Sequence, residues 1–403
     1  MAQQLSNGRS HMAEILSKIS DSIRDIGEAI ALPAEAYTSD EFFDFERAAI
    51  FSRSWLFLCH ESEVAALGQA LRVTVLGEPL LVTRGENGAI RVLSAVCQHR
   101  GYILGEENVT PRHIRCPYHY WTYSLDGRLV GAPSMVPEWE LKQLKRNIRL
   151  PELRAETWHG LVFANFDLAA EPLAPSLRRL DEVIRTHHIQ DMATAKTVGF
   201  ERLPYNWKNM LENALEEYHT TYVHRGFHDN APAHLVEHGI YEHGDGAVYR
   251  HAGLIIKGGE DVPGRPTFPV IDGLRDRDRG YMIFLAIPPT LFAAVYPHGV
   301  KTFRVLPLSA SEIEMRISLL FPPATIAAAD FESKFERQLS LIELLDGPDI
   351  ASNTRVFQGM QSRFAPRGPL GPQEATLPQL YQWLLYWCGD AIADTSEPSA
   401  QRP

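Results

Sequence analysis

Two cysteines and two histidines stand in two close pairs, and their side chains suit a metal. The order is Cys97-x-His99, then sixteen residues, then Cys116-x-x-His119. Thiolates and imidazoles bind zinc, but two of each also suit a [2Fe–2S] cluster with two Cys on one iron and two His on the other. Each pair can give one ligand to each iron, so two loop tips would hold such a cluster. A chance grouping is the poorest interpretation.

A second pair of histidines, His219 and His224, lies five residues apart in the later half of the chain. On a regular α-helix five residues turn through about 140°. The two rings can therefore converge only if the helix ends or bulges between them, and Thr220-Thr221 is the expected place. Two imidazoles and one carboxylate bind non-haem Fe(II) and leave positions open for O2 and substrate. Two unrelated surface histidines are the plainer alternative.

Both groups lie in motifs that resemble the Rieske non-haem iron oxygenases, and specifically their oxygenase (alpha) subunits. Cys-x-His-Arg-Gly and Cys-Pro-Tyr-His resemble the two cluster loops. The later segment resembles the catalytic helix of the family in Asn206-Trp207-Lys208, Glu212-Asn213, Glu216, His219 and His224. The resemblance covers about residues 40–370. It implies that Cys97, His99, Cys116 and His119 bind a [2Fe–2S] cluster.

The resemblance also implies a third iron ligand, an Asp from a late helix. Asp349 has the spacing of the family to a following glycine, Gly359, and Asp346 is its rival at the same turn. We therefore expect His219, His224 and Asp349 to hold Fe(II). An Asp that follows a proline could instead cap a helix N-terminus.

An acid is expected to connect the two metal centres. In the family, the residue at the position of Glu216 bridges a cluster histidine and an iron histidine of different subunits, and the cluster partner would be His119. By spacing, Glu216 would share a helix face with His219. Hydrogen bonds from both rings would fix their tautomers, and the carboxylate would offer electrons a short route. The neighbouring Glu217 is expected to be a solvated helix residue.

Three tyrosines bear on which branch of the family this sequence resembles. Tyr102 and Tyr118 stand where respiratory-chain Rieske proteins have an extra pair of cysteines, so the disulfide of that branch cannot form here. The pattern matches the oxygenase and ferredoxin branch. Tyr120 departs from it, because that branch usually has Gly at this position. If the backbone needs a positive φ there, Tyr120 is strained.

The candidate ligands must be positioned by helices and strands. The sequence patterns of these elements predict an α+β chain of two main domains. Short β-branched runs with Asn-Gly and Asp-Gly turns predict a small all-β Rieske [2Fe–2S] domain over residues 46–165. The runs YMIFLAI, TLFAAVY, KTFRVLPL and EIEMRISLLF predict an antiparallel sheet in a catalytic iron domain over 166–403. The resemblance implies a helix-grip-like α+β fold for this second domain.

Helical spacing of apolar residues predicts the remaining elements. Helices are expected over residues 12–31, 176–188, 207–224, 328–345 and 377–393. Thr38-x-x-Glu41 predicts a capping box for another helix. Residues 1–45 form an N-terminal helical segment, in which Ser10-His11-Met12 indicates a tag at 1–11. Residues 258–281 are rich in Gly, Pro and charge and predict a long loop, either a lid or disorder.

Composition excludes several classes of function. A net charge of -11 without a basic run argues against nucleic acid as a partner. The longest apolar runs are far shorter than the roughly 20 residues that span a bilayer, and the first residues lack a signal-peptide core. Cys59 and Cys388 stand alone in apolar surroundings and are expected to be buried free thiols. They favour a reducing, cytoplasmic setting.

We therefore expect the oxygenase component of a Rieske mono- or dioxygenase. It would use O2 to hydroxylate an aromatic ring or an alkyl group, as in aromatic hydrocarbon catabolism. The sequence has no dinucleotide motif, so a separate reductase, with or without a ferredoxin, must supply electrons from NAD(P)H. The resemblance implies a homotrimer, to which some members add a beta subunit. The alternative is an amine or quaternary-ammonium monooxygenase that removes N-methyl groups, with an aromatic cage for the cation. A pure electron carrier and a zinc-stapled binding protein are further alternatives.

Overall fold

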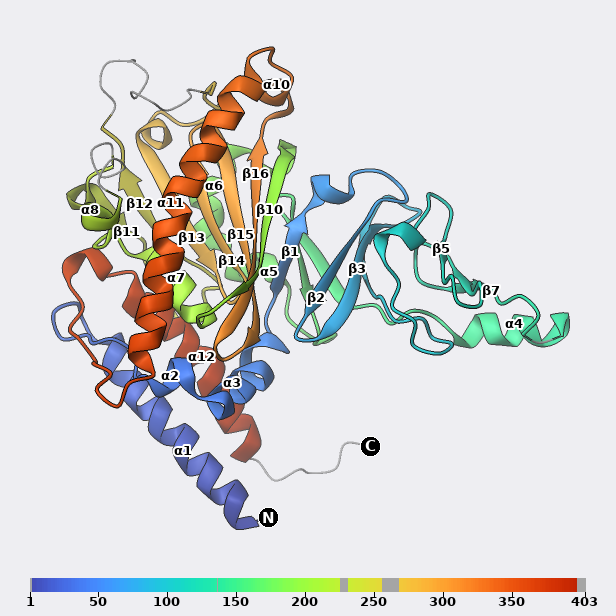
Figure 1. The fold of residues 1–403 in the computed structure, drawn as a ribbon, viewed down its shortest axis with the longest axis horizontal. Helices are drawn as coiled ribbons and strands as arrows, with labels where there is room; N and C mark the ends of the chain where they lie inside the picture. The colour runs from blue at the N-terminus through green and yellow to red at the C-terminus, as the bar shows by residue number, and fades with distance from the viewer. Residues whose placement is uncertain (1, 136, 225–230, 256–267, 397–403) are drawn as a thin grey trace. The chain divides into compact units, whose positions relative to one another are not determined.

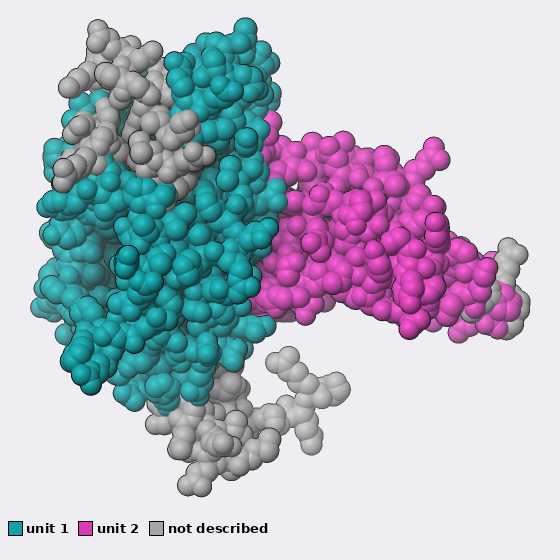
Figure 2. All heavy atoms as spheres, viewed as in Figure 1, with its two compact units in different colours: residues 1–51, 174–189, 195–403 teal, residues 52–173, 190–194 magenta. Residues whose placement is uncertain are grey.

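The computed structural model describes residues 2–135, 137–224, 231–255 and 268–396 (Figure 1). They form two compact units, which Figure 2 shows in different colours. The smaller unit consists of residues 52–173 and 190–194. The larger unit consists of residues 1–51, 174–189 and 195–403, so the N-terminal helical segment clusters with the late part of the chain.

The smaller unit is built from three antiparallel sheets of three strands each. The first sheet contains β1 (Leu56–His60), β9 (Leu161–Asn165) and β8 (Arg154–Trp158), and the second contains β2 (Ala70–Val75), β3 (Glu78–Arg84) and β4 (Ile90–Ser94). The third, which carries one cluster loop, contains β5 (Ile114–Arg115), β6 (Thr122–Tyr123) and β7 (Leu129–Gly131). The predicted β-rich character is confirmed, although helix α4 (Glu138–Asn147) was not predicted.

The larger unit contains a seven-stranded antiparallel sheet with the order β10-β16-β15-β14-β13-β12-β11. Its strands are β10 (Ala193–Leu203), β11 (Val236–His238), β12 (Val248–Gly253), β13 (Tyr281–Ile287), β14 (Leu291–Tyr296), β15 (Gly299–Ser309) and β16 (Glu312–Phe321). Helix α7 (Trp207–Leu215) contacts β13, β15 and the long helix α11 (Phe331–Met360). Figure 1 shows α11 crossing this sheet. The expected α+β fold is confirmed.

Two helix predictions near the N-terminus were wrong in their bounds. The first helix, α1, covers Ala2–Ser20 and ends with the 3-10 turn η1 (Asp21–Ile23), whereas the prediction extended it to residue 31. Gly27 adopts a φ of 102°, which a right-handed helix excludes. The cap of α3 (Asp40–Glu46) is Ser39, whose hydroxyl accepts a hydrogen bond from the backbone N–H of Phe42, and the predicted Thr38 belongs to α2 (Glu35–Thr38).

Helix α11 is 30 residues long and continues through Pro348. The predicted end at residue 345 was therefore wrong, because packing against α7 and α2 sustains the helix through the missing backbone N–H. Asp349 lies inside this helix, which excludes the alternative role as an N-cap residue. Helix α5 (Leu173–Ser176) begins at the last residue of the first segment of the smaller unit, and the larger unit also contains α6 (Arg178–Ile184), α10 (Pro323–Ile326) and α12 (Leu377–Ser396).

Cys59 and Cys388 are buried free thiols, as predicted. Residues 258–267 of the predicted loop at 258–281 lie outside the described residues, and the 3-10 turn η8 (Arg277–Gly280) lies near the end of that loop, just before β13. Within the described ranges, no helix combines the length and the apolar character that crossing a membrane requires.

Candidate metal centres

The two candidate cluster loops have the same backbone path. In the first, the N–H of Cys97 donates to the carbonyl of Tyr102 at 2.9 Å, and in the second the N–H of Cys116 donates to the carbonyl of Trp121 at 2.8 Å. Equivalent inner bonds join Gly101 to Cys97 and Tyr120 to Cys116, both at 2.9 Å. The two motifs are alike in sequence because they form the same structure. Each is a short closed loop that presents one Cys and one His.

Tyr120 takes the place in its loop that Gly101 takes in the other. Gly101 has a φ of 74° and Tyr120 has a φ of 60°. The left-handed conformation costs a residue with a Cβ roughly 1–2 kcal/mol. The strain that the departure from the family pattern suggested is therefore present, and the loop accommodates it. The Arg115 guanidinium lies 5.9 Å from the centre of the exposed Tyr120 ring.

The loops bring the four sequence-predicted cluster ligands together. Cys97 and Cys116 are 2% and 1% exposed, and the rings of His99 and His119 have centroids 4.6 Å apart. The Nδ1 atoms of both rings are buried and have no hydrogen-bond partner among the described residues. Buried polar atoms are almost always partnered, so this donor set of two thiols and two orphaned nitrogens fits a [2Fe–2S] cluster.

Neighbouring side chains support these loops. The ring of Trp121 stacks on that of His99, with the ring centres 4.8 Å apart. The Tyr123 hydroxyl lies 3.2 Å from the Cys97 sulfur and accepts a hydrogen bond of 3.0 Å from the N–H of Gln98. Burial raises the pKa of Cys116, and the adjacent Cys97 raises it further. A metal ion offsets both effects, because it stabilises thiolates.

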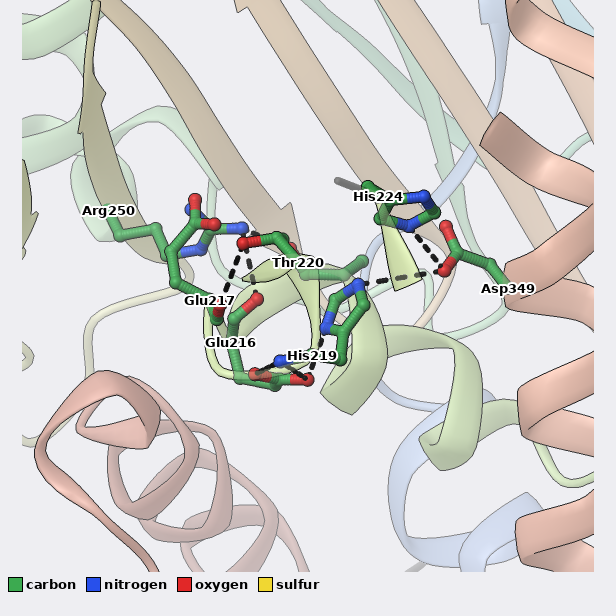
Figure 3. A network of polar contacts seen from close by, with 8 residues as sticks. Glu216, Glu217, His219, Thr220, His224, Arg250 and Asp349 are labelled. Carbon is green, nitrogen blue, oxygen red and sulfur yellow. Dashed lines mark hydrogen bonds and ion pairs between the residues drawn. The ribbon is translucent and has the colours of Figure 1, made fainter. Parts of the chain in front are cut away.

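In the larger unit, His219, His224 and Asp349 converge from two elements. His219 precedes and His224 follows the short helix α8 (Thr220–Val223), and Asp349 projects from α11. Their ligand atoms all lie within 4.8 Å of one another. The Asp349 carboxylate is 2.8 Å from Nε2 of His224 and 3.6 Å from Nε2 of His219, and Figure 3 shows both rings directed at it. The side chain of the rival, Asp346, lies outside the described residues.

The predicted helix over 207–224 breaks earlier than expected. It ends at Leu215, and Glu216 is extended with φ -111° and ψ 155°. The break therefore precedes His219, and the prediction of a bulge at Thr220-Thr221 was wrong. The two histidines converge because they stand at the two ends of α8, a helix of four residues. The expectation that Glu216 shares a helix face with His219 was wrong for the same reason.

Glu216 nevertheless contacts His219. Its carboxylate accepts a hydrogen bond from the His219 backbone N–H at 3.1 Å and makes a short hydrogen bond with Nδ1 of the ring. Burial lowers the pKa of His219, but the hydrogen bond and charge of Glu216, together with Asp349, outweigh burial and raise it. With Nδ1 held by Glu216, Nε2 faces Asp349 and is the atom available to a metal. These donors fit Fe(II), which takes two imidazoles and a carboxylate.

Sequence reasoning missed a buried ion pair beside this site. Glu217, expected to be solvated, is 1% exposed and contacts the guanidinium of Arg250, which is 2% exposed. A signal for it exists in β12, where Val248, Arg250 and Ala252 occupy the buried positions of an alternating strand. A buried arginine requires an acidic partner, but the sequence does not say which acid.

A pocket adjoins the three candidate iron ligands. Its apolar lining includes Met210, Phe284, Phe292, Tyr296, Phe303 and Met315. Phe292 and Tyr296 both lie on β14 and contribute two of these aromatic rings. Arg250 and Lys301 also line this pocket. The arrangement can hold an apolar molecule beside a metal with open positions.

Comparisons with known proteins agree with this geometry. The carnitine monooxygenase oxygenase subunit of Escherichia coli (strain K12) is 33% identical over 209 residues, which are 50% of this chain and 54% of that protein. The 2-aminobenzenesulfonate 2,3-dioxygenase subunit alpha of Alcaligenes sp is 32% identical over 198 residues, 47% of this chain and 48% of that protein. The chain thus spans about half the length of the curated relatives it matches.

Solved structures share the fold over almost the whole chain. Naphthalene 1,2-dioxygenase from Rhodococcus sp. bound to indole has a TM-score of 0.78 and 22% identity, with coverage of 96% of this chain and 99% of that chain. A quaternary ammonium Rieske monooxygenase in complex with an inhibitor has a TM-score of 0.74 and 23% identity, with coverage of 92% and 98%.

Two family models match the two parts of the chain. Residues 54–151 match the Rieske [2Fe-2S] domain, and residues 178–390 match the ring hydroxylating alpha subunit (catalytic domain). Because the second match alone spans more than half of the 403 residues, the chain belongs to the family of ring hydroxylating alpha subunits and carries a Rieske [2Fe-2S] domain before its catalytic domain.

Proposed function

We propose that this chain is the oxygenase component of a Rieske mono- or dioxygenase that hydroxylates an organic substrate with O2. The observation that carries the proposal is the convergence of His219, His224 and Asp349, within 4.8 Å, beside an apolar pocket. These residues would hold Fe(II), which supplies O2 activation at its open positions. Cys97, Cys116 and the two histidines of their loops, His99 and His119, would hold the [2Fe–2S] cluster that supplies single electrons.

The protein side chains orient the reacting parts. Glu216 accepts the Nδ1–H of His219 and so keeps Nε2 free for the metal. In this proposal Glu216 is also the catalytic residue on the electron path. Its carboxylate would accept a hydrogen bond from a cluster histidine of a neighbouring subunit in a homotrimer. The apolar walls bind the substrate and exclude water from the reacting atoms. The functional division is a cluster domain over 46–165 and a catalytic domain over 166–403.

The proposed reaction consumes electrons, and their source implies partner proteins. A reductase, with or without a ferredoxin, would pass electrons from NAD(P)H to the cluster, and a beta subunit would join the trimer in some assemblies. Buried free thiols, such as Cys59 and Cys388, favour the cytoplasm, where thiols stay reduced.

The pocket favours an aromatic or alkyl substrate without a permanent positive charge. A quaternary ammonium group is recognised over the open face of an aromatic ring. Here the Arg250 guanidinium lies 4.2 Å from the centre of the Phe284 ring, and the Lys301 ammonium lies 4.6 Å from that of Phe303. Cations of the chain itself therefore cover two of the pocket rings, and these ring faces are not open to a cationic group of a substrate.

An amine or quaternary-ammonium monooxygenase is the second candidate. It is favoured by the names of relatives, which include a carnitine monooxygenase, a glycine betaine monooxygenase and an N,N-dimethyl phenylurea N-demethylase. In this pocket, Phe292 and Tyr296 would have to supply the aromatic cage.

The test uses the purified full chain, its visible spectrum and its metal content. We expect a red-brown protein with about three irons per chain, two in the cluster and one at the second site. The reduced protein is then mixed with 18O2 and either toluene, benzoate, glycine betaine or carnitine. Labelled ring or methyl alcohol supports the main proposal, whereas formaldehyde from the ammonium compounds supports the second candidate. A colourless protein with zinc, or two irons without oxygenation, would overturn both.

A further inference from the structure

The turn between α7 and α8 carries both Glu216 and His219, yet it has no regular secondary structure of its own. Carbonyl groups at the end of a helix lack intrahelical partners. Here Arg250, from the neighbouring strand β12, donates hydrogen bonds to the carbonyl of Ala214 at 3.1 Å and to that of Glu216 at 3.2 Å. The same guanidinium pairs with the carboxylate of Glu217 (Figure 3).

A guanidinium is suited to this task because it is planar and presents five donors in a fixed fork. Arg250 engages three acceptors that belong to residues 214, 216 and 217. It is 2% exposed, and its charge is balanced by Glu217 rather than by water. The Phe284 ring packs against it at 4.2 Å. A lysine ammonium in this place has the charge but not the geometry to reach all three acceptors.

The three acceptors lie on both sides of the residue that orients the candidate iron ligand. The carbonyl of Glu216 is held by Arg250, while its carboxylate accepts the backbone N–H and Nδ1 of His219. We propose that Arg250 and Glu217 form a positioning pair: they fix the turn after α7 so that Glu216 holds His219 with Nε2 toward Asp349. The inference rests on the proposed function, since it concerns the metal that these ligands would share.

A matched control lies at the other end of the same helix. Lys208, near the start of α7, is 2.7 Å from Glu46, and the two side chains are 2% and 0% exposed. This pair is as buried as Arg250 and Glu217, and its loss should also destabilise the fold. It is placed away from the turn that carries Glu216 and His219. A purely structural role for Arg250 therefore predicts equal effects of the two pairs on every measurement.

The experiment measures metal affinity rather than turnover. The mononuclear metal is removed from the full chain with the cluster retained, and Co(II) is returned by equilibrium dialysis, with metal analysis and Co(II) EPR as readouts. We expect Arg250→Met and Glu217→Gln to weaken Co(II) binding about ten- to a hundredfold, as loss of an outer partner of a ligand does. Arg250→Lys should leave most of this loss in place. Lys208→Met should lower the unfolding temperature but bind Co(II) like the wild type.

Hydrogen exchange gives an independent readout in the apoprotein. The amides of residues 214–219 should exchange faster in Arg250→Met than in Lys208→Met. Glu217→Gln preserves side-chain volume, so it tests the pair even if Arg250→Met does not fold. Unchanged Co(II) affinity in Glu217→Gln, or full restoration by Arg250→Lys, would overturn the inference. A wild-type protein that binds no Co(II) would instead overturn the proposed function.

Discussion

The cluster loops and the mononuclear site differ in how their residues are brought together. The four candidate cluster ligands lie between residues 97 and 119, and backbone hydrogen bonds inside each loop close around them. At the other site, His219 and His224 are close in sequence, but Asp349 comes from a helix 125 residues beyond His224. A local motif can shape its own ligand loop, whereas the second site exists only after the larger unit has folded.

The supporting contacts show the same difference. The Cys97 sulfur shares its outer hydrogen bond with the hydroxyl of Tyr123, a residue of the adjoining β6. His219 depends on Glu216, and the turn of Glu216 depends on Arg250 from β12. Mutations near the cluster should therefore change the structure only locally. Mutations around the mononuclear site should affect several helices and strands.

The largest expected effects come from removing one ligand in each region. His219→Ala should lose the mononuclear metal and reduce turnover roughly a thousandfold or more, which corresponds to several kcal/mol. It should keep the visible cluster bands. Cys116→Ser should lose these bands and retain the mononuclear metal. Metal analysis and absorbance check both, and O2-dependent turnover in His219→Ala would show that the second site is assigned wrongly.

A buried carboxyl group of the larger unit offers a test by pH. Burial raises the pKa of Glu212 from its ordinary 4.5 to about 7, against the hydrogen bond from the Tyr37 hydroxyl at 2.7 Å. Its protonated form stabilises the fold below pH 4.5, and this contribution is lost as the pH rises to about 7. The free energy of unfolding of Glu212→Gln should therefore rise relative to that of the wild type between pH 4.5 and about pH 7, by up to about 3 kcal/mol. Above about pH 7 the difference between the two proteins should stay constant.

Thermal unfolding from pH 4 to pH 8.5 measures this difference. Glu41→Gln, at an exposed position of α3, is the matched control and should follow the wild type throughout. A gain in Glu212→Gln that does not change with pH would contradict the prediction.

A local hydrogen bond should tune the cluster. The Tyr123 hydroxyl lies 3.2 Å from the Cys97 sulfur, and hydrogen bonds to sulfur stabilise the reduced form of a cluster. Tyr123→Phe should lower the reduction potential by some tens of millivolts, since a net hydrogen bond contributes about 1 kcal/mol. Redox titration followed by absorbance checks it, while Co(II) affinity of the second site should not change. A higher potential would refute the direction of this effect.

The smallest expected effect concerns the strained residue of the second loop. Tyr120→Gly should relieve the positive φ of 60° and stabilise the smaller unit by less than about 1 kcal/mol, because glycine entropy offsets part of the gain. Tyr120→Ala removes the ring but keeps the Cβ. The difference between the alanine and glycine variants therefore measures the backbone strain without the contribution of the ring. Thermal bleaching of the visible bands should occur latest in the glycine variant. Equal behaviour of the two variants would mean that the backbone strain is negligible.

The sequence alone predicted a β-rich part followed by an α+β part with an antiparallel sheet, because period-two alternation and Gly turns are local signals. By residue type and spacing it also marked the two Cys-His pairs and the pair His219 and His224, whereas Asp349 followed from the resemblance to the family. It misplaced the break in the helix over 207–224, because the extended backbone at Glu216 depends on donors from β12. It also ended α11 too early, since contacts with α7 and α2 sustain the helix through Pro348.

Glu217 and Asp349 show where sequence information ends. Glu217 reads as a solvated helix residue, and only tertiary packing places it against Arg250, 33 residues away. Asp349 and Asp346 were rivals by spacing, and the folded chain brings Asp349 to within 2.8 Å of His224. Residue types and local periodicity determined which chemistry the chain can support and which elements carry it. The tertiary structure decided which buried charges meet and which way each ligand points, because those contacts join segments that are far apart in the sequence.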